Sequence, residues 1–245
     1  MIKTFSLTDI GKKRSMNQDF VFSSEKSVGN LPNLFIVADG MGGHNGGGYA
    51  SSYAVEVIRE FIENSDLTGP EALFKSAIEE ANTKVRIKAA ENPELSGMGT
   101  TVVMACLFDD TLYVANVGDS RLYVIDSDIR QITTDHSYVE EMIKVGQLDR
   151  ESARTHSQKN IITRAVGAED TVVSDFFSVA LHPGDTVLMC SDGLTNMLED
   201  RDISLILKSG RDVVGKAEEL VKAANANGGK DNIAVILIEP FSGQN

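Results

Sequence analysis

Runs of apolar and β-branched residues recur along the chain and are separated by polar turns, a pattern typical of short strands. Two neighbouring runs are joined only by Asp109-Asp110, which predicts a tight hairpin. The predicted strands are 20–23, 33–38, 101–108, 111–117, 121–125, 175–179, 186–190 and 233–239.

Longer segments at 48–63, 70–90 and 213–225 place apolar residues at helical spacing, which predicts amphipathic helices. Pro70 followed by Glu71 is typical of a helix start, and Gly228-Gly229 is typical of the turn after a helix. Because the strands arrive as adjacent hairpins and the helices in separate blocks, the pattern predicts antiparallel sheets with helices packed outside them.

Residues 137–159 interrupt this alternation, since they are polar and charged and carry few apolar residues at helical spacing. Two interpretations stay open: an ordinary surface connection, or an inserted flap that acts as a lid or recognition element. The length of 245 residues alone allows one or two domains, but no low-complexity linker divides the chain. We expect a single domain at 1–240 with a flap at about 137–160, followed by a C-terminal tail at 241–245.

The net charge of −13 argues against binding to nucleic-acid phosphates and against adhesion to an anionic membrane surface. Cys106 and Cys190 lie inside apolar runs, which predicts buried free thiols rather than a disulfide framework. The first residues lack the features of a signal peptide, and no apolar run is long enough to span a bilayer. We therefore expect a cytoplasmic protein with no nucleic-acid and no membrane partner.

Aspartates stand at the boundaries of several predicted strands. Asp39 and Asp192 each end an apolar strand and precede a glycine, Asp119 lies between two strands, and Asp19 and Asp231 stand near the start of others. Each one alone is a common turn residue. Sheets stacked face to face can bring strand ends to one rim, where two like charges 4 Å apart repel by roughly 4 kcal/mol at an effective dielectric of 20. A cation would remove that repulsion, so the set predicts a metal centre.

An all-oxygen ligand set favours Mg²⁺ or Mn²⁺, because zinc sites usually recruit Cys or His at spacings that this chain lacks. No Asp-x-Asp-x-Asp-Gly sequence is present, which disfavours a calcium-binding EF-hand. The glycine-rich stretch 40–48 lacks the Gly-Lys-Ser/Thr ending of a P-loop, and Asn45 stands where a dinucleotide-binding loop has its last glycine. We interpret this stretch as a compact backbone path around a metal.

Short motifs follow one another along nearly the whole chain. They are Arg14-Ser-Met-Asn17-Gln-Asp19, Asp39-Gly-Met-Gly-Gly43, Gly99-Thr-Thr101, Gly118-Asp-Ser-Arg121, Asp135-His-Ser137, Asn160-Ile-Ile-Thr-Arg-Ala-Val-Gly167, Ser191-Asp-Gly193 and Gly228-Gly-Lys-Asp231-Asn232. In this order they resemble the motifs of PPM/PP2C-type protein phosphatases, and of their bacterial branch in particular. The resemblance implies an α+β fold, a four-layer α-β-β-α sandwich in which two antiparallel β-sheets are flanked by helices, with a flap subdomain beside the metal cleft. It also implies an enzyme that dephosphorylates phosphoserine and phosphothreonine on proteins.

The same resemblance assigns metal ligands to individual positions. Asp39 resembles the carboxylate that bridges two core Mn²⁺ or Mg²⁺ ions, and the Gly40 carbonyl resembles a ligand of the second ion. Asp192 and Asp231 correspond to ligands of the first ion. Asp119 together with Asp192 matches the third-metal position of bacterial members.

Further roles are implied for residues around the metals. Asp19 corresponds to a ligand that acts mostly through metal-bound water, and Asn232 is expected to support Asp231 from behind. Arg14 matches the arginine that binds the substrate phosphate, a role that suits a guanidinium because it can pair two phosphate oxygens at once.

The implied mechanism is direct attack of a metal-bridging hydroxide on phosphorus, so that no nucleophilic Cys or Ser is required. The leaving alkoxide needs a proton, but Met41 stands where eukaryotic members have a histidine after the Asp-Gly. His44 and a metal-bound water are the competing proton donors. His136 is expected to be a structural hydrogen-bonding residue.

Two other functions compete with an active phosphatase. One is a catalytically silent phosphoprotein-binding module on the same fold, which the retention of all the metal aspartates disfavours. The other is a metal-dependent phosphodiesterase or small-phosphoester hydrolase, which stays open because the flap and outer surface select what carries the phosphate. We expect a monomer whose partners are phosphoprotein substrates, including a Hanks-type Ser/Thr kinase and its targets.

Overall fold

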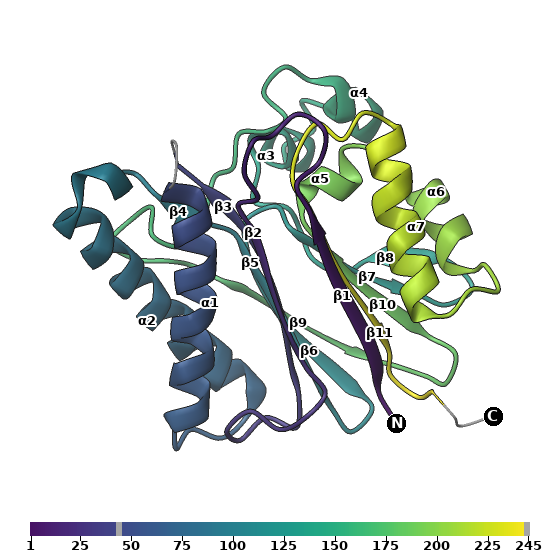
Figure 1. Ribbon diagram of the computed structural model, residues 1–245, viewed down its shortest axis with the longest axis horizontal. Helices are drawn as coiled ribbons and strands as arrows, with labels where there is room; N and C mark the ends of the chain where they lie inside the picture. Colours follow the sequence, from purple (N-terminus) through teal and green to yellow (C-terminus); the bar gives the residue numbers. More distant parts are fainter. Residues whose placement is uncertain (43–45, 243–245) are drawn as a thin grey trace.

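Two antiparallel sheets pack face to face in the computed structural model, which describes residues 1–42 and 46–242 (Figure 1). The five-stranded sheet has the order β1-β11-β10-β7-β8 and the second sheet the order β2-β3-β5-β6-β9, with the short β4 paired to β3. The strands are β1 Lys3–Asp9, β2 Asp19–Ser24, β3 Leu34–Met41, β4 Gly99–Thr100, β5 Val102–Phe108, β6 Thr111–Val117, β7 Arg121–Ile125, β8 Ile129–Gln131, β9 Asp175–Ala180, β10 Thr186–Cys190 and β11 Ile233–Glu239.

Helices cover the outer face of each sheet, which completes the four layers of the predicted sandwich (Figure 1). The long helices α1 and α2 pack on the β2-β3-β5-β6-β9 sheet, whereas α6 and α7 pack on the other sheet. The helices are α1 Gly46–Asn64, α2 Pro70–Glu91, α3 Tyr138–Lys144, α4 Arg150–Thr155, α5 Asp192–Thr195, α6 Asp200–Leu207 and α7 Val213–Ala226, with a 3₁₀ turn at Pro93–Leu95.

Strand β3 shows why the central strands read as unbroken apolar runs. Its side chains alternate between two cores: Leu34 and Ile36 face the helices α1 and α2, whereas Phe35 and Val37 face the other sheet. Both faces are therefore buried, and no polar residue interrupts the strand before Asp39.

The structure confirms the predicted strands and helices with small shifts of their ends and adds elements that the sequence pattern did not predict. Three of these are short: β4, β8 and the four-residue α5. The edge strand β1 was not predicted because it is only partly buried and mixes polar with apolar residues. Asp39 lies within β3 rather than at its end, and Asp192 begins α5 rather than ending a strand.

The flap region holds two short helices, α3 and α4, rather than irregular chain. Each is capped by a side chain, since Ser137 accepts a hydrogen bond from the Glu140 amide and Asp149 accepts one from the Ser152 amide. The caps explain why a segment with so few apolar residues is helical. At the other end of the described chain Phe241 packs against the core between the sheets.

Strands β1 and β11 lie side by side, with Lys3 opposite Glu239, and bring both chain ends to one end of the sandwich (Figure 1). The flap helices lie at the opposite end (Figure 1). Among the described residues, no helix is both long and apolar enough to cross a membrane.

Candidate metal centre and catalytic cleft

A cleft of about 260 Å³ opens at the rim of the two sheets. Its walls come from separate parts of the chain: the β1–β2 connection, the end of β3, the β6–β7 turn, the start of α5 and the approach to β11. The predicted site residues that line it are Arg14, Asp39, Gly40, Asp119, Asp192, Asp231 and Asn232. The structure therefore brings together residues that the sequence spaces across the whole chain.

Asp19 lies beneath this cleft, directly opposite Asp39 in the β2–β3 pairing. The Asp19 carboxylate is buried, and its Oδ2 accepts a hydrogen bond of 2.6 Å from the Ser191 hydroxyl. Its Oδ1 is buried with no hydrogen-bond partner. Asp39 is fixed by its backbone, because its N–H donates to Thr101 Oγ1 and its carbonyl accepts from Thr100 Oγ1, both at 2.9 Å.

Burial and mutual repulsion raise the pKa of these carboxyl groups. Burial is the main cause for Asp39 and Asp119, whose pKa values lie well above the ordinary range, and neighbouring aspartates add to it. The pKa of Asp192 is raised to about 6, chiefly by burial and then by Asp231. The pKa of Asp19 is raised to about 7 by burial, although the Ser191 hydrogen bond opposes the shift. Keeping several of these carboxylates ionised at neutral pH costs free energy, and a bound cation would offset that cost.

Arg14 supplies positive charge at this rim. Its guanidinium donates to Asp231 Oδ2 at 2.6 Å, and this contact raises the pKa of Arg14. The remaining guanidinium N–H groups are free of other protein partners in the described structure. A planar guanidinium with unused N–H donors is suited to binding a phosphate group.

Asn232 makes contacts with several segments of the rim. Its side-chain amide donates to the carbonyls of Ile10 and Met16 and its Oδ1 accepts from the Gln18 amide, all at 2.9 Å. The side chain thus holds the segment that carries Arg14. Its backbone N–H donates to the Asp231 carboxylate, also at 2.9 Å.

Two glycines allow the backbone segments of the rim to approach closely. A Cβ on Gly40 would lie 1.9 Å from the Gly47 carbonyl oxygen, and one on Gly193 would lie 1.8 Å from the Asn232 carbonyl oxygen. No side chain fits at either position without moving the backbone, so the glycine after each Asp is required by packing.

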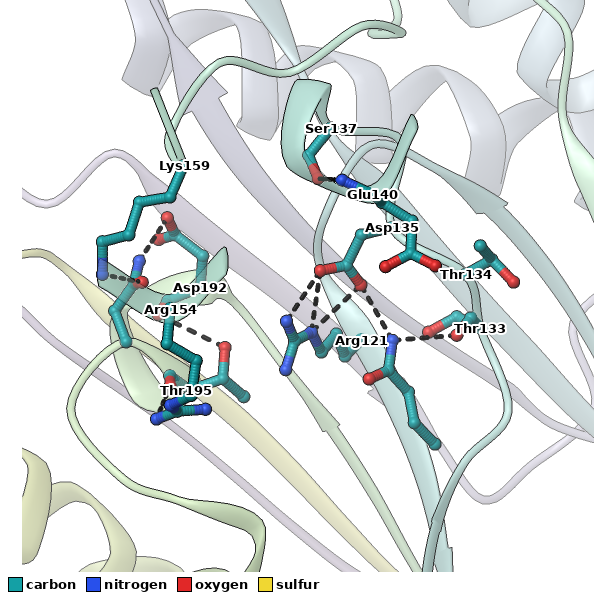
Figure 2. Close-up of polar contacts among 12 residues, drawn as sticks. Arg121, Thr133, Thr134, Asp135, Ser137, Glu140, Arg154, Lys159, Asp192 and Thr195 are labelled. Carbon is teal, nitrogen blue, oxygen red and sulfur yellow. Dashed lines mark hydrogen bonds and ion pairs between the residues drawn. The ribbon is translucent and has the colours of Figure 1, made fainter. Parts of the chain in front are cut away.

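The flap is tied to the metal centre by hydrogen bonds to α5 (Figure 2). Lys159 donates to Asn196 Oδ1 at 2.8 Å, and the Asn196 amide donates to Asp192 Oδ2, also at 2.8 Å. Arg154 from α4 donates to the carbonyls of Thr195 and Leu198, at 3.4 Å each. The orientation of the Asp192 carboxylate therefore depends on a residue outside the cleft and, through it, on the flap.

A partly buried ion pair stabilises the other side of the flap base (Figure 2). Arg121 donates to both carboxylate oxygens of Asp135, with its shortest contact at 2.7 Å, and to the Tyr123 hydroxyl at 2.9 Å. His136 is buried, its Nδ1 accepts from the Gly118 amide, and its Nε2 lies 3.1 Å from Asp175. The prediction that His136 is a structural hydrogen-bonding residue is confirmed.

As the side chains stand, no group of three or more His, Cys, Asp or Glu residues in 1–42 and 46–242 is arranged to hold a metal ion. The carboxylates contact other groups of the protein: Asp231 pairs with Arg14, Asp192 accepts from Asn196 and Asp19 accepts from Ser191. The donor set still fits Mg²⁺ or Mn²⁺, because it is all oxygen and includes the buried, unpartnered Asp19 Oδ1.

His44, the predicted proton donor, lies outside the described residues. Sequence reasoning missed Ser191, Asn196 and Lys159 as supports of the acidic cluster. Ser191 belongs to the Ser191-Asp192-Gly193 motif and could have been found there. Lys159 and Asn196 are 37 positions apart, and no local pattern links them.

Comparisons with known proteins agree with this site. The profile of the family described as protein phosphatase 2C matches residues 11–237. The serine/threonine phosphatase stp of Listeria innocua is 41% identical over 239 residues, which cover 95% of this chain and 93% of that protein.

Solved structures extend the comparison to the fold. The serine/threonine phosphatase Stp1 from Staphylococcus aureus matches with a TM-score of 0.92 at 35% identity, over 99% of this chain and 96% of that one. The catalytic domain of the phosphatase PstP, solved in complex with two manganese ions, matches with a TM-score of 0.84 at 28% identity and 97% coverage of both chains.

Fold and cleft together define the PPM class of metal-dependent phosphatases. The chain belongs to the protein phosphatase 2C family, within which it is a serine/threonine protein phosphatase of the bacterial type.

Proposed function

We propose that this phosphatase hydrolyses phosphoserine and phosphothreonine on proteins in a single step, by in-line attack of water on phosphorus. The observation that carries the proposal is the convergence of Asp39, Asp119, Asp192, Asp231 and Arg14 on one cleft. Divalent cations bound there would activate the attacking water and shield the charge of the phosphoryl oxygens. Two Mn²⁺ or Mg²⁺ ions in the core, held by Asp19, Asp39, Gly40, Asp192 and Asp231, and a third at Asp119 and Asp192, belong to this proposal.

The cysteines support a mechanism without a covalent phosphoenzyme. Cys106 and Cys190 are both buried away from solvent. Burial raises the pKa of Cys106 to about 12 and the pKa of Cys190 higher still. Both therefore stay protonated at neutral pH, whereas a nucleophilic cysteine must be a thiolate.

Arg14 would orient the substrate. Its guanidinium is partly exposed at the cleft and held by a single carboxylate, so it can turn its free N–H groups to two phosphate oxygens while Asp231 keeps it in place. The proton for the leaving alkoxide has two proposed sources, His44 and a water molecule on the cations.

The biological setting is part of the proposal. We infer a cytoplasmic monomer that opposes a Hanks-type Ser/Thr kinase by dephosphorylating the kinase and its targets. Relatives named as serine/threonine phosphatases support the substrate class.

The test is hydrolysis of p-nitrophenyl phosphate and of a phosphothreonine peptide with Mn²⁺, with Mg²⁺ and with chelator. Wild type should require the metal, and Asp192→Asn should lose most activity on both substrates. Asp202→Asn, an exposed change on α6, is the control that should leave the rates unchanged. Metal-independent hydrolysis, or full activity of Asp192→Asn, would contradict the proposal.

A further inference from the structure

A second hollow of about 400 Å³ lies beside the catalytic cleft. We call it the flanking groove. Most of its lining is apolar: Met41, Ile162, Ala165, Ala168, Val172 and Val173. Met41 and Ile162 line the cleft as well, so the two hollows share a wall and a bound substrate can extend from one into the other.

The other hollow beside the cleft has opposite chemistry. It lies under the flap, has a volume of about 360 Å³ and shares Asp119 and Asp192 with the cleft. Charged side chains dominate its lining, and several are already paired, as Arg121 is with Asp135 and Arg150 with Glu140. An apolar side chain entering there would strip water from charged groups, which is unfavourable.

The packing and charges of the flanking groove suit an apolar guest. Ala165 is buried and Val172 packs against the α1–α2 core, so this part of the wall is held in place. Arg164 is neutralised by Asp175 at 2.9 Å. Glu169 lies exposed in the lining and would repel an acidic guest.

We propose that the flanking groove receives an apolar side chain of the phosphoprotein substrate, located within a few residues of the phosphoserine or phosphothreonine. This inference rests on the proposed function, since the phosphate must sit in the cleft for its neighbours to reach the groove. An extended peptide advances about 3.3–3.6 Å per residue, so only near neighbours can enter. The phosphatase thus selects substrates with an apolar residue, and against those with an acidic residue, next to the phosphate.

The experiment uses phosphothreonine peptides that differ at one flanking position, with Leu, Ser or Asp there. Each kcat/KM is divided by the rate of the same variant on p-nitrophenyl phosphate, which has no flanking residues. Wild type should prefer the Leu peptide over the Asp peptide by about tenfold, the discrimination that a modest apolar pocket provides. Val173→Lys should reverse that order in favour of the Asp peptide.

The matched control is Leu205→Lys. Val173 is 62% exposed and Leu205, on α6, is 63% exposed, so both substitutions place a cation on the surface, but only the first lies in the groove. Leu205→Lys should keep the wild-type preference. Equal values for the three peptides on the wild type, or the same preferences in both variants, would overturn the inference. Metal-dependent hydrolysis of p-nitrophenyl phosphate reports the proposed function separately.

Discussion

The two carboxylate oxygens of Asp19 have contrasting surroundings. One accepts a hydrogen bond from Ser191, and the other is buried without a partner. Leaving a buried acceptor unpaired costs about 1–3 kcal/mol. A buried acceptor kept unpaired points to a function beyond folding, and Asp19 would be satisfied by helping to hold a cation.

Replacing Asp39 and replacing Arg14 should affect different kinetic constants. Asp39→Asn should lower kcat by roughly 10³-fold or more, because Asp39 is the carboxylate expected to bridge the cations. Arg14→Ala should mainly raise KM, by about 10- to 100-fold, because it removes charged hydrogen bonds to the phosphate. Steady-state kinetics on a phosphothreonine peptide separate the two effects.

Arg130→Ala is the control for Arg14. Both arginines form a single surface ion pair, and their side chains are 49% and 48% exposed, respectively. Arg130 lies on β8, outside the cleft lining, and its replacement should leave both constants unchanged. Equal and modest losses in Asp39→Asn and Arg14→Ala would contradict the division of roles.

The ionised Asp192 carboxylate should destabilise the folded protein when no metal is bound. An unfolded chain ionises Asp192 near the ordinary value of 3.8, whereas in the folded protein burial and Asp231 raise its pKa to about 6. Between these values the folded state holds a proton that the unfolded chain has lost, so this contribution to stability falls as pH rises through the window.

With chelator present, Asp192→Asn should therefore melt at a higher temperature than the wild type, and the gap should widen from pH 4 to about pH 6 and then level off. Each kcal/mol of relieved repulsion corresponds to about 2–4 °C in Tm for a protein of this size. Thermal melts across pH measure the gap. A gap that shrinks as pH rises would show that the carboxylate is not strained in the folded protein.

Asn196, the residue that follows α5, joins the flap to the metal centre. Asn196→Ala should free the Asp192 carboxylate to turn and should weaken Mn²⁺ binding by about 10-fold, the lower end of effects seen when a supporting hydrogen bond is lost. Isothermal titration calorimetry measures the affinity without reference to activity. Asn227→Ala is the control, because Asn227 donates to the nearby Met197 carbonyl and does not contact Asp192. The same Mn²⁺ affinity in both variants would show that the hydrogen bond from Asn196 to Asp192 does not support metal binding.

The contact between α5 and β11 depends on Gly193. Gly193→Ala would drive a Cβ into the Asn232 carbonyl and should destabilise the fold by about 3 kcal/mol, the upper end of the usual cost of overpacking. Gly210→Ala is the comparison, since a Cβ there meets no atom within 4 Å. Urea denaturation should show no loss of stability for Gly210→Ala. Equal losses of stability in the two variants would mean that the backbone around Gly193 can shift to accommodate the added Cβ.

The elements that the sequence predicted are those with a strong repeating pattern. Strand β3 is buried on both faces, and helix α2 carries a regular apolar stripe, so each stands out in the chain. Helix α5 has four residues and contains a glycine, which resembles a turn in sequence. The flap helices depend on caps at Ser137 and Asp149 rather than on an apolar face, and such local signals are weak without the fold around them.

The residues of the site also differ in how well the sequence predicts them. Its aspartates were predictable because each stands at a strand boundary in a family motif, whereas the hydrogen bond from Lys159 to Asn196 exists only because the flap folds back onto α5. Asn232 was predicted as a support for Asp231, and its further contacts with Ile10, Met16 and Gln18, more than 200 positions away, were not predicted. Such contacts follow from the topology of the two sheets and not from any local pattern.

For the whole molecule, metal binding and stability should be linked. A cation that binds only the folded state stabilises it by about 2.7 kcal/mol at a concentration 100 times its Kd. Saturating Mn²⁺ should therefore raise the Tm of the wild type by about 5–10 °C, given 2–4 °C for each kcal/mol. Asp39→Asn should lose most of this rise in the same thermal melts, whereas a full rise in that variant would place the cation elsewhere.

Strand β11 is the last strand in the described part of the chain, yet it lies between β1 and β10 and directly follows Asp231 and Asn232. Strand β1 is at the edge of its sheet and pairs with β11 along its whole length. The first and last strands therefore depend on each other: a chain cut before β11 should leave β1 without its partner, and the cleft without Asp231 and Asn232 should not bind metal.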